Sequence, residues 1–284
     1  MGWSEFFDDL ELIAGQKITV NDGDYLNADG LWMCGKCNTP KQSRIEVLGE
    51  VRTPMCLCQC EQDKQNAEVE EAKRLKKANQ IEMLRNDGFP DAEMRRFRFD
   101  TDDGKNPVSE VARRYVENFE QMLEDGKGLL LFGSVGTGKT FIAACIANAL
   151  IDKCIPCLVT NFSRITNTLT GMYEGKQSYI DSLNRYDLLI IDDLATERDT
   201  EYMNEIVFNI IDARSRVNKP LIVTTNLTAE ELKRPAEVRK QRIYSRLFEM
   251  CIPVEVKGKD RRKEVLREDM SKYSDLLGLG VANG

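Results

Sequence analysis

Residues 133–140 read Gly133-Ser134-Val135-Gly136-Thr137-Gly138-Lys139-Thr140, which matches the pattern G-x-x-x-x-G-K-[ST] of a phosphate-binding loop. An apolar run at 129–132 precedes the loop, and a helical apolar pattern begins at Phe141. This context predicts a strand, a tight glycine turn and a helix whose N-terminus faces an anion. A plain glycine turn is the alternative, but such a turn requires neither the strand nor the helix. We therefore predict that the residues from Gly133 to Phe141 bind the phosphates of a nucleotide.

Two side chains of this loop have distinct predicted roles. The ammonium group of Lys139 is expected to reach the β- and γ-phosphates. The hydroxyl of Thr140 is expected to bind Mg²⁺. The loop therefore predicts ATP and Mg²⁺ as ligands.

A second apolar run ends in two carboxylates. Residues 187–193 read Asp187-Leu188-Leu189-Ile190-Ile191-Asp192-Asp193, which is typical of a strand buried on both faces. The carboxyl ends of such strands carry the ligand-binding groups of α/β sheets. Asp192 is therefore predicted to hold Mg²⁺, directly or through water, and Asp193 to orient and polarise the attacking water. An acidic strand end exposed to solvent is the alternative.

Strand-like and helical patterns alternate through the larger part of the chain. The strand candidates are the runs 128–133, 157–161, 187–193, 221–226 and 251–256. Helical patterns lie between them, for example at 139–151 and 200–217, and residues 162–184 are long enough for two helices. This alternation predicts an α/β fold in which helices cover both faces of a central parallel sheet.

The fourth strand candidate ends in the polar amide of Asn226. If this strand lies between those that end at Gly133 and Asp192, Asn226 lies beside the γ-phosphate of a bound nucleotide. There it can hydrogen-bond both that phosphate and the attacking water, which predicts a sensor role. A turn cap is the alternative.

Five of the nine cysteines form two groups, Cys34-Gly35-Lys36-Cys37 and Cys56-Leu57-Cys58-Gln59-Cys60. In a reducing compartment this spacing favours a tetrahedral zinc site over disulfide bonds. Because one Zn²⁺ takes four of these five thiolates, it stays open which two cysteines of the second group bind. An iron–sulfur cluster and a redox-active pair are the alternatives.

These patterns divide the chain into three parts. Residues 1–60 are predicted to form a small zinc-ribbon-like module, which is too small to fold readily without its metal. Residues 61–87 are highly charged, with acids preceding bases at helical spacing, and they predict a helical linker. Residues 88–284 are predicted to form the larger domain, after a break at 88–90.

The composition limits the possible functions. The 284 residues carry a net charge of −7, so contact with nucleic acid must come from local basic patches. The absence of histidine excludes histidine-dependent catalysis and histidine metal ligands. No apolar run approaches the roughly 20 residues that span a bilayer, and the acidic N-terminus lacks the basic start of a signal peptide. We therefore expect a cytoplasmic protein that makes no use of a membrane.

The loop at 133–140, the strand ends at 192–193 and 225–226, and the later segment 242–247 together resemble the AAA-plus ATPases. They are most similar to the replicative-helicase loaders of the DnaC type, found in bacteria and their phages, and to the related IstB transposition helpers. The resemblance covers about residues 90–270. It implies a three-layer P-loop sandwich that hydrolyses ATP with Mg²⁺. Some loaders also carry an N-terminal zinc-binding domain that docks on the helicase.

The resemblance also implies roles for individual residues. Lys139 corresponds to the nucleotide-binding lysine, and Thr140 and Asp192 correspond to the Mg²⁺ ligands. Asn226 corresponds to the first sensor. Asp193 stands where many members have glutamate, and its shorter carboxylate is expected to slow the activation of water.

Two arginines also correspond to functional residues of the family. Arg246 matches the arginine finger, which completes the ATP site of a neighbouring subunit and so implies self-association through a shared site. Arg262 matches the second sensor, although the adjacent Arg261 is close enough to take that role. A surface ion pair is the alternative for either arginine.

The segment 162–184 lies where loaders and initiators carry an extra helix that faces single-stranded DNA. Arg164 and Lys176 supply positive charge and Tyr173 supplies a stacking ring, the two ingredients of such binding. An ordinary solvated helix pair is the alternative.

The predicted function is an ATP-dependent helicase loader in DNA replication. It binds the replicative hexameric helicase and single-stranded DNA and hydrolyses ATP as a switch. One alternative keeps the ATPase but makes it an IstB-like helper of DNA transposition. Two others are a P-loop phosphotransferase and a zinc-dependent DNA-binding adaptor that holds ATP without turnover.

Overall fold

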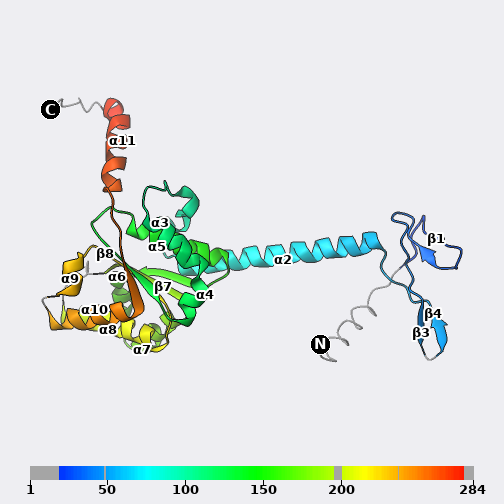
Figure 1. The fold of residues 1–284 in the computed structure, drawn as a ribbon, viewed down its shortest axis with the longest axis horizontal. Helices are drawn as coiled ribbons and strands as arrows, with labels where there is room; N and C mark the ends of the chain where they lie inside the picture. Colours follow the sequence, from blue (N-terminus) through cyan, green and yellow to red (C-terminus); the bar gives the residue numbers. More distant parts are fainter. Residues whose placement is uncertain (1–18, 48, 195–199, 236, 278–284) are drawn as a thin grey trace. The chain divides into compact units, whose positions relative to one another are not determined.

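The computed structural model describes residues 19–47, 49–194, 200–235 and 237–277. The chain forms two compact units, Met1–Lys77 and Ala78–Gly284. Figure 1 shows short strands in the first unit and a sheet with covering helices in the second.

The first unit is built from two pairs of short antiparallel strands. These pairs are β1 (Tyr25–Leu26) with β2 (Trp32–Met33), and β3 (Ile45–Val47) with β4 (Glu50–Arg52). Among its described residues, only Cys34, Lys41 and Cys58 are fully buried. A unit with so small a core needs another source of stability, such as a metal ion.

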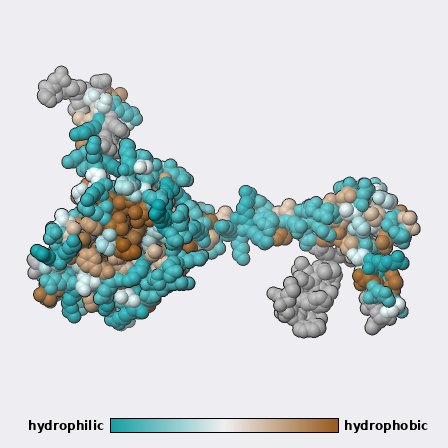
Figure 2. All heavy atoms as spheres, viewed as in Figure 1, coloured by the Kyte–Doolittle hydropathy of each residue, from teal (hydrophilic) through white to brown (hydrophobic). Residues whose placement is uncertain are grey.

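Helix α2 (Gln59–Gly88) begins in the first unit and ends in the second. Its surface is hydrophilic (Figure 2), and pairs one turn apart, such as Glu70 with Lys73, add modest stability. Gly88 is the one buried residue of this fully described helix. A Cβ at Gly88 would lie 2.2 Å from the carbonyl oxygen of Cys157, so only glycine allows this close approach to the sheet.

The second unit contains a five-stranded parallel sheet. In spatial order its strands are β6 (Cys157–Asn161), β7 (Leu188–Leu194), β8 (Leu221–Thr225), β5 (Gly128–Phe132) and β9 (Cys251–Glu255). The predicted α/β class is therefore confirmed. Each predicted strand is present, because short runs of apolar residues were bounded clearly by polar ones.

Helices cover both faces of the sheet (Figure 1). One face carries α3 (Val108–Glu117), α4 (Phe119–Glu124) and α5 (Lys139–Asp152). The other carries α6 (Phe162–Gly171), α7 (Lys176–Ser182), α8 (Glu201–Arg216) and α10 (Val238–Met250). Leu129 and Leu131 belong to the first core and Leu130 to the second, because successive side chains of a strand point to opposite faces.

The shorter elements lie between these layers or follow them. They are the 3₁₀ turns η1 (Met94–Arg96), η2 (Phe99–Thr101) and η3 (Leu183–Arg185), the short helix α9 (Ala229–Lys233), and the last helix, α11 (Arg261–Leu277). The prediction of two helices within 162–184 is confirmed by α6 and α7.

The strand order decides which loops meet. Strand β8 lies between β7 and β5, so the segments that follow these three parallel strands lie at one edge of the sheet. The glycine loop follows β5, the residues Asp192 and Asp193 lie near the end of β7, and Asn226 follows β8. The predicted sensor role of Asn226 required its strand to lie between those that end at Gly133 and Asp192. The strand order meets this requirement.

Candidate functional site

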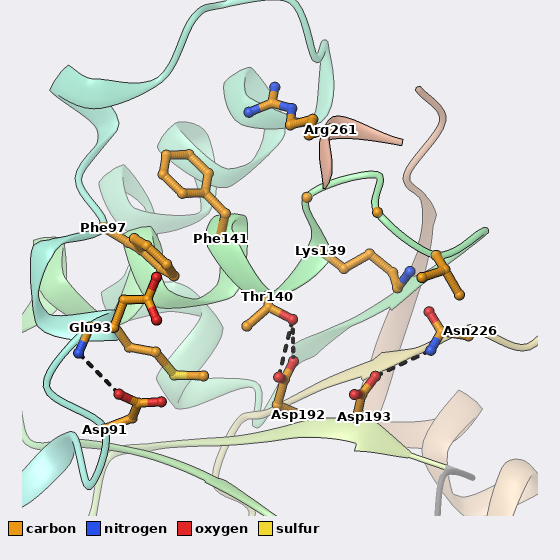
Figure 3. Close-up of a pocket in the computed structure, with 14 residues that line it drawn as sticks. Asp91, Glu93, Phe97, Lys139, Thr140, Phe141, Asp192, Asp193, Asn226 and Arg261 are labelled. Carbon is orange, nitrogen blue, oxygen red and sulfur yellow. Dashed lines mark hydrogen bonds between the residues drawn. The ribbon is translucent and has the colours of Figure 1, made fainter. Parts of the chain in front are cut away.

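A pocket of about 700 Å³ lies where these three segments meet (Figure 3). Its volume is in the range of small-molecule sites. It is lined by Asp91, Glu93, Met94, Phe97, Val135, Gly136, Gly138, Lys139, Thr140, Phe141, Asp192, Asp193, Asn226 and Arg261. The pocket thus brings together most of the residues that the sequence predicted for nucleotide binding.

The glycine loop has a backbone that other residues do not readily adopt. Gly136 has φ +80° and Gly138 has φ +93°, both in the left-handed region. A Cβ at Gly136 would also lie 2.0 Å from the carboxylate of Asp260. Helix α5 begins directly after the loop without a side-chain cap, so the N–H groups of its first turn can bind a phosphate.

The ammonium group of Lys139 lies against its own loop. Its Nζ donates to the carbonyl oxygens of Gly133 and Ser134, at 2.9 and 2.7 Å. Thr137 faces inward as well, because its hydroxyl donates to the carbonyl of Ser134 at 3.0 Å. The lysine is buried, so its charge acts in a medium that screens it less than water does. These features fit a polyphosphate group that is held by the loop.

Asp192 is the centre of a hydrogen-bond cluster. The Thr140 hydroxyl donates to its two oxygens, at 2.9 and 3.1 Å, and the Thr224 hydroxyl donates at 2.5 Å. Burial raises the pKa of the Asp192 carboxyl above its ordinary value, and the two hydroxyl bonds oppose that rise. A hydroxyl beside a carboxylate fits Mg²⁺, which prefers one or two such protein ligands together with water and phosphate oxygens.

Asp193 and Asn226 form a second polar pair in the pocket. The amide Nδ2 of Asn226 donates to the Asp193 carboxylate at 3.3 Å (Figure 3). Asp193 has φ +60°, an unfavourable conformation for a residue with a Cβ. Backbone strain of this kind is often concentrated at functional sites.

An apolar wall with two nearby acids forms another part of the pocket. The rings of Phe97 and Phe141 lie 5.3 Å apart between centroids (Figure 3). Met94 lines the same pocket. Asp91 and Glu93 add carboxylates. Only Phe141 was predicted from the sequence. The residues 91–97 were missed because they lie in turns and 3₁₀ structure and match no motif; their position at the start of the predicted larger domain was the only available signal.

The predicted arginines lie in different places. Arg261 lines the pocket, and its guanidinium donates to Asp103 at 2.9 Å while its backbone N–H donates to Gly136 at 3.0 Å. The side chain of Arg262 lies outside the described residues. Arg246 belongs to α10 and pairs with Asp212 at 3.0 Å and Glu249 at 2.7 Å, so the structure does not bring it to this pocket.

Four cysteines of the first unit form a separate cluster. The sulfur atoms of Cys34, Cys37, Cys58 and Cys60 lie within 4.8 Å of one another, and the pair Cys34–Cys60 is 3.6 Å apart. A tetrahedral site with Zn–S bonds of about 2.3 Å needs sulfur separations near 3.8 Å, so this set fits zinc. Cys56 lies outside the cluster and contacts the carbonyl oxygen of Pro40 at 3.7 Å. In the second group, Cys58 and Cys60 are therefore the two cysteines that are placed to bind a metal ion.

Polar and charged groups lie around the cluster and contact two of its cysteines. Hydrogen bonding with the Thr39 hydroxyl lowers the pKa of Cys37 to about 6, which favours the thiolate that a metal needs. Lys41 is completely buried nearby, and it pairs with Asp24 at 2.9 Å and Glu61 at 3.3 Å. Glu61 in turn accepts a hydrogen bond from the backbone N–H of Cys58, at 3.3 Å.

The residues predicted to contact DNA lie on α6, on α7 and between them. Arg164 and Lys176 are exposed, and Tyr173 is completely exposed between the two helices. Their exposure leaves them accessible to a ligand. Separately, no helix in the described ranges is both long and apolar enough to span a membrane.

Comparison with known proteins gives one family match and several relatives. Residues 65–268 match the family described as IstB-like ATP binding protein. The replicative helicase loader DnaI of Bacillus subtilis is 26% identical over 149 residues, or 48% of this chain and 48% of that protein. The replicative helicase loader DnaC of Escherichia coli K12 is 27% identical over 140 residues, or 48% of this chain and 56% of that protein. The match thus spans about half the length of these two relatives.

A solved structure shares the fold of the second unit. The crystal structure of DnaI superimposes with a TM-score of 0.52 and 26% identity, covering 61% of this chain and 95% of that chain. The likeness therefore includes nearly all of the solved DnaI chain.

Proposed function

This chain belongs to the family of IstB-like ATP-binding proteins, and from that premise we propose that it is an Mg²⁺-dependent ATPase that loads a replicative helicase onto single-stranded DNA. The resemblance to AAA-plus helicase loaders is confirmed by this family match and by the similarity to DnaI and DnaC. One observation carries the ATPase proposal: Lys139, Thr140 and Asp192 line a single pocket, with the Thr140 hydroxyl bonded to Asp192.

The pocket offers separate places for the parts of a nucleotide. The glycine loop and Lys139 bind the phosphates, and the apolar wall of Phe97 and Phe141 accommodates the base. Thr140 and Asp192 would hold Mg²⁺, which would offset the negative charge of the phosphates when bound. Glu93 and Asp91 are placed on the base side, where a carboxylate accepts hydrogen bonds from an amino group.

Hydrolysis requires a water molecule in line with the γ-phosphate. Asp193 orients this water and accepts its proton, and Asn226 holds the Asp193 carboxylate at 3.3 Å. The carboxylate of an aspartate reaches less far toward the γ-phosphate than that of a glutamate, because its side chain is one methylene shorter. We therefore propose slow turnover, which suits a switch between ATP-bound and ADP-bound states.

The arginine that completes the site comes from a second copy of the chain. Arg246 is held on α10 by Asp212 and Glu249, away from the pocket of its own subunit. In a ring or filament of subunits, the same arginine would face the γ-phosphate of a neighbour and stabilise transition-state charge. Self-association through the ATP site therefore belongs to this proposal. Arg261 takes the second-sensor role, because it lines the pocket of its own subunit.

The first unit is proposed to be the docking module for the helicase. We assign residues 1–60 to a zinc-stabilised module, residues 61–87 to a helical linker and residues 88–284 to the ATPase domain. Support comes from the cluster of Cys34, Cys37, Cys58 and Cys60 and from the length of α2, which is exposed along most of its course. Single-stranded DNA is proposed to contact Arg164, Tyr173 and Lys176.

Two measurements test the two parts of the proposal. Purified chain should release phosphate from ATP only with Mg²⁺, and Lys139→Ala should abolish this release. Capture of the replicative helicase should survive Lys139→Ala but be lost with the double variant Cys37→Ser/Cys58→Ser. The variant Cys56→Ser is the matched control, because its sulfur lies outside the cluster. Unchanged helicase capture by the double variant would contradict the docking role.

A second candidate is an IstB-like helper of DNA transposition. The description of the matching family favours it, whereas the names of the curated relatives favour the loader. Parallel capture experiments with a replicative helicase and with a transposase of the IS21 type separate the two. Binding to the transposase alone, on duplex DNA, would replace the loader proposal without affecting the ATPase proposal.

A further inference from the structure

The two acids of the pocket lie in an irregular part of the sheet. Ile191 pairs with Val223, and Leu194 pairs with Thr225. Asp192 and Asp193 of β7 are therefore opposed by the single residue Thr224 of β8, which is a β-bulge. A bulge leaves backbone groups without their regular partners in the ladder, so something else must bond them.

The hydroxyl of Thr224 bonds both acidic residues at once. It accepts a hydrogen bond from the backbone N–H of Asp193, at 2.9 Å. It donates to the Oδ1 of Asp192, at 2.5 Å. Thr224 is completely buried, so water does not compete for these two bonds. One oxygen atom therefore fixes the backbone of one acid and the carboxylate of the other.

Both bonds have consequences for the site. Asp193 is held at φ +60°, and the bond to its N–H helps to stabilise this unfavourable conformation. The carboxylate of Asp193 is thereby directed at Asn226. The bond to Asp192 restrains the carboxylate that Thr140 also contacts, so the oxygen pair keeps one orientation toward Mg²⁺.

We propose that Thr224 is the positioning residue of this site, whose single hydroxyl orients the Mg²⁺-binding carboxylate of Asp192 and fixes the backbone that presents Asp193 to the attacking water. This inference rests on the proposed ATPase function. It adds a residue that touches neither nucleotide nor metal and acts through the two acids. A serine is expected to replace it, because serine keeps the same hydroxyl.

The neighbouring Thr225 provides a matched control. It is also completely buried, and its hydroxyl also makes two hydrogen bonds. These bonds go to backbone groups, to the carbonyl of Leu194 at 2.9 Å and from the N–H of Leu227 at 3.2 Å. Loss of either hydroxyl removes two buried bonds, but only the Thr224 hydroxyl contacts a carboxylate of the pocket.

The test compares Thr224→Val, Thr224→Ser and Thr225→Val in the full chain. The first readout is the Mg²⁺ concentration needed for half-maximal binding of a fluorescent ATP analogue. The second is the affinity for the same analogue in EDTA, and the third is phosphate release at saturating Mg²⁺. Thermal unfolding of each variant serves as the measure of folding.

Thr224→Val is expected to need about 10- to 100-fold more Mg²⁺, the usual effect of removing a group that orients a metal ligand. Its affinity in EDTA should stay at the wild-type value, because the glycine loop and Lys139 are intact. Its phosphate release should stay low even at saturating Mg²⁺, because Asp193 is no longer held. Thr224→Ser should restore all three quantities, and Thr225→Val should keep the wild-type Mg²⁺ requirement.

An equal Mg²⁺ requirement in Thr224→Val and Thr225→Val would overturn the inference while leaving the ATPase proposal intact. Failure of the wild type to bind nucleotide with Mg²⁺ would overturn both. If Thr224→Val does not fold, Thr224→Ala and Thr224→Ser replace it, since these two variants differ only by the hydroxyl. A Mg²⁺ requirement that is the same in alanine and serine variants would then refute the positioning role.

Discussion

The hydroxyl of Thr140 donates to both carboxylate oxygens of Asp192, at 2.9 and 3.1 Å, across 52 positions of sequence. Thr140 lies in the first turn of α5 and Asp192 near the end of β7. This contact therefore joins the two segments on which the nucleotide site depends. Together the hydroxyl and the carboxylate supply protein oxygens of the kind that Mg²⁺ binds, beside a loop that suits phosphate.

The first prediction concerns the carboxylate of Asp192. Asp192→Asn removes the negative charge that we propose to hold Mg²⁺. Phosphate release should therefore fall by about 100-fold or more, a larger loss than removal of a group that only orients a metal ligand. Asp187→Asn is the control, because Asp187 lies just before the other end of the same strand and pairs with Lys219 at 2.9 Å. Steady-state phosphate release over a Mg²⁺ series measures both. Equal phosphate release by Asp192→Asn and Asp187→Asn would contradict the proposed role of Asp192 in Mg²⁺ binding.

The second prediction concerns the base. Phe141→Ala should weaken nucleotide binding by about tenfold, because stacking on an aromatic ring contributes roughly 1–3 kcal/mol per base. The loss should be the same with and without Mg²⁺, since the ring lies away from Asp192 (Figure 3). Phe248→Ala, at an exposed position of α10, is the matched control. An unchanged dissociation constant for Phe141→Ala, measured by fluorescence titration, would place the base elsewhere.

Local sequence patterns predicted the parts of this site that depend on local chemistry. The glycine loop needs residues that tolerate positive φ, and Gly136 and Gly138 provide them within a few positions of Lys139. Buried strands need continuous apolar runs, so the runs before Asp192 and Asn226 were visible as strands. Because parallel strands carry ligand groups at their carboxyl ends, the sequence also placed these side chains at one edge of the sheet.

The parts that were missed depend on contacts between distant segments. Phe97 reaches the pocket because 3₁₀ turns fold it against Phe141, and no sequence pattern records that approach. The sequence does not distinguish Thr224 from other threonines in strands. Its role becomes visible only in the structure, where the bulge in β7 places two acids opposite it. Cys56 fits the spacing of a zinc ligand as well as Cys58 does, and only the fold directs its sulfur away.

The third prediction concerns the zinc ion proposed for the first unit. The purified chain should contain one Zn²⁺, and Cys58→Ser should lose it while Cys56→Ser retains it. Trp32 lies in β2 of this unit, and the sequence has no tryptophan after it, so tryptophan fluorescence reports the folding of this unit separately from the second unit. A zinc chelator should change that fluorescence and leave nucleotide binding unaltered, because structural zinc provides folding free energy to small domains. Metal content equal to the wild type in Cys58→Ser would contradict the assignment of the four ligands.

The last prediction concerns Arg246, which we propose to complete the ATP site of a neighbouring subunit. Arg246 is fixed on α10 by Asp212 and Glu249, and the structure places it outside the lining of its own pocket. If it serves a neighbour, Arg246→Ala should lower phosphate release by about 10³-fold or more, the usual effect of removing an arginine finger. ATP affinity should change little, because Lys139 and the loop are unaffected. Arg216→Ala is the control, since Arg216 also pairs with Asp212.

Mixing two inactive variants distinguishes a shared site from a structural ion pair. Lys139→Ala lacks a working loop but keeps Arg246, whereas Arg246→Ala keeps the loop. Mixed assemblies therefore contain interfaces in which one subunit supplies the loop and the other supplies the arginine, and phosphate release should reappear. The recovered activity should rise steeply with total protein concentration if the complete site exists only between subunits. A mixture as inactive as its components would show that Arg246 acts within its own subunit, where its pairing with Asp212 would then be purely structural.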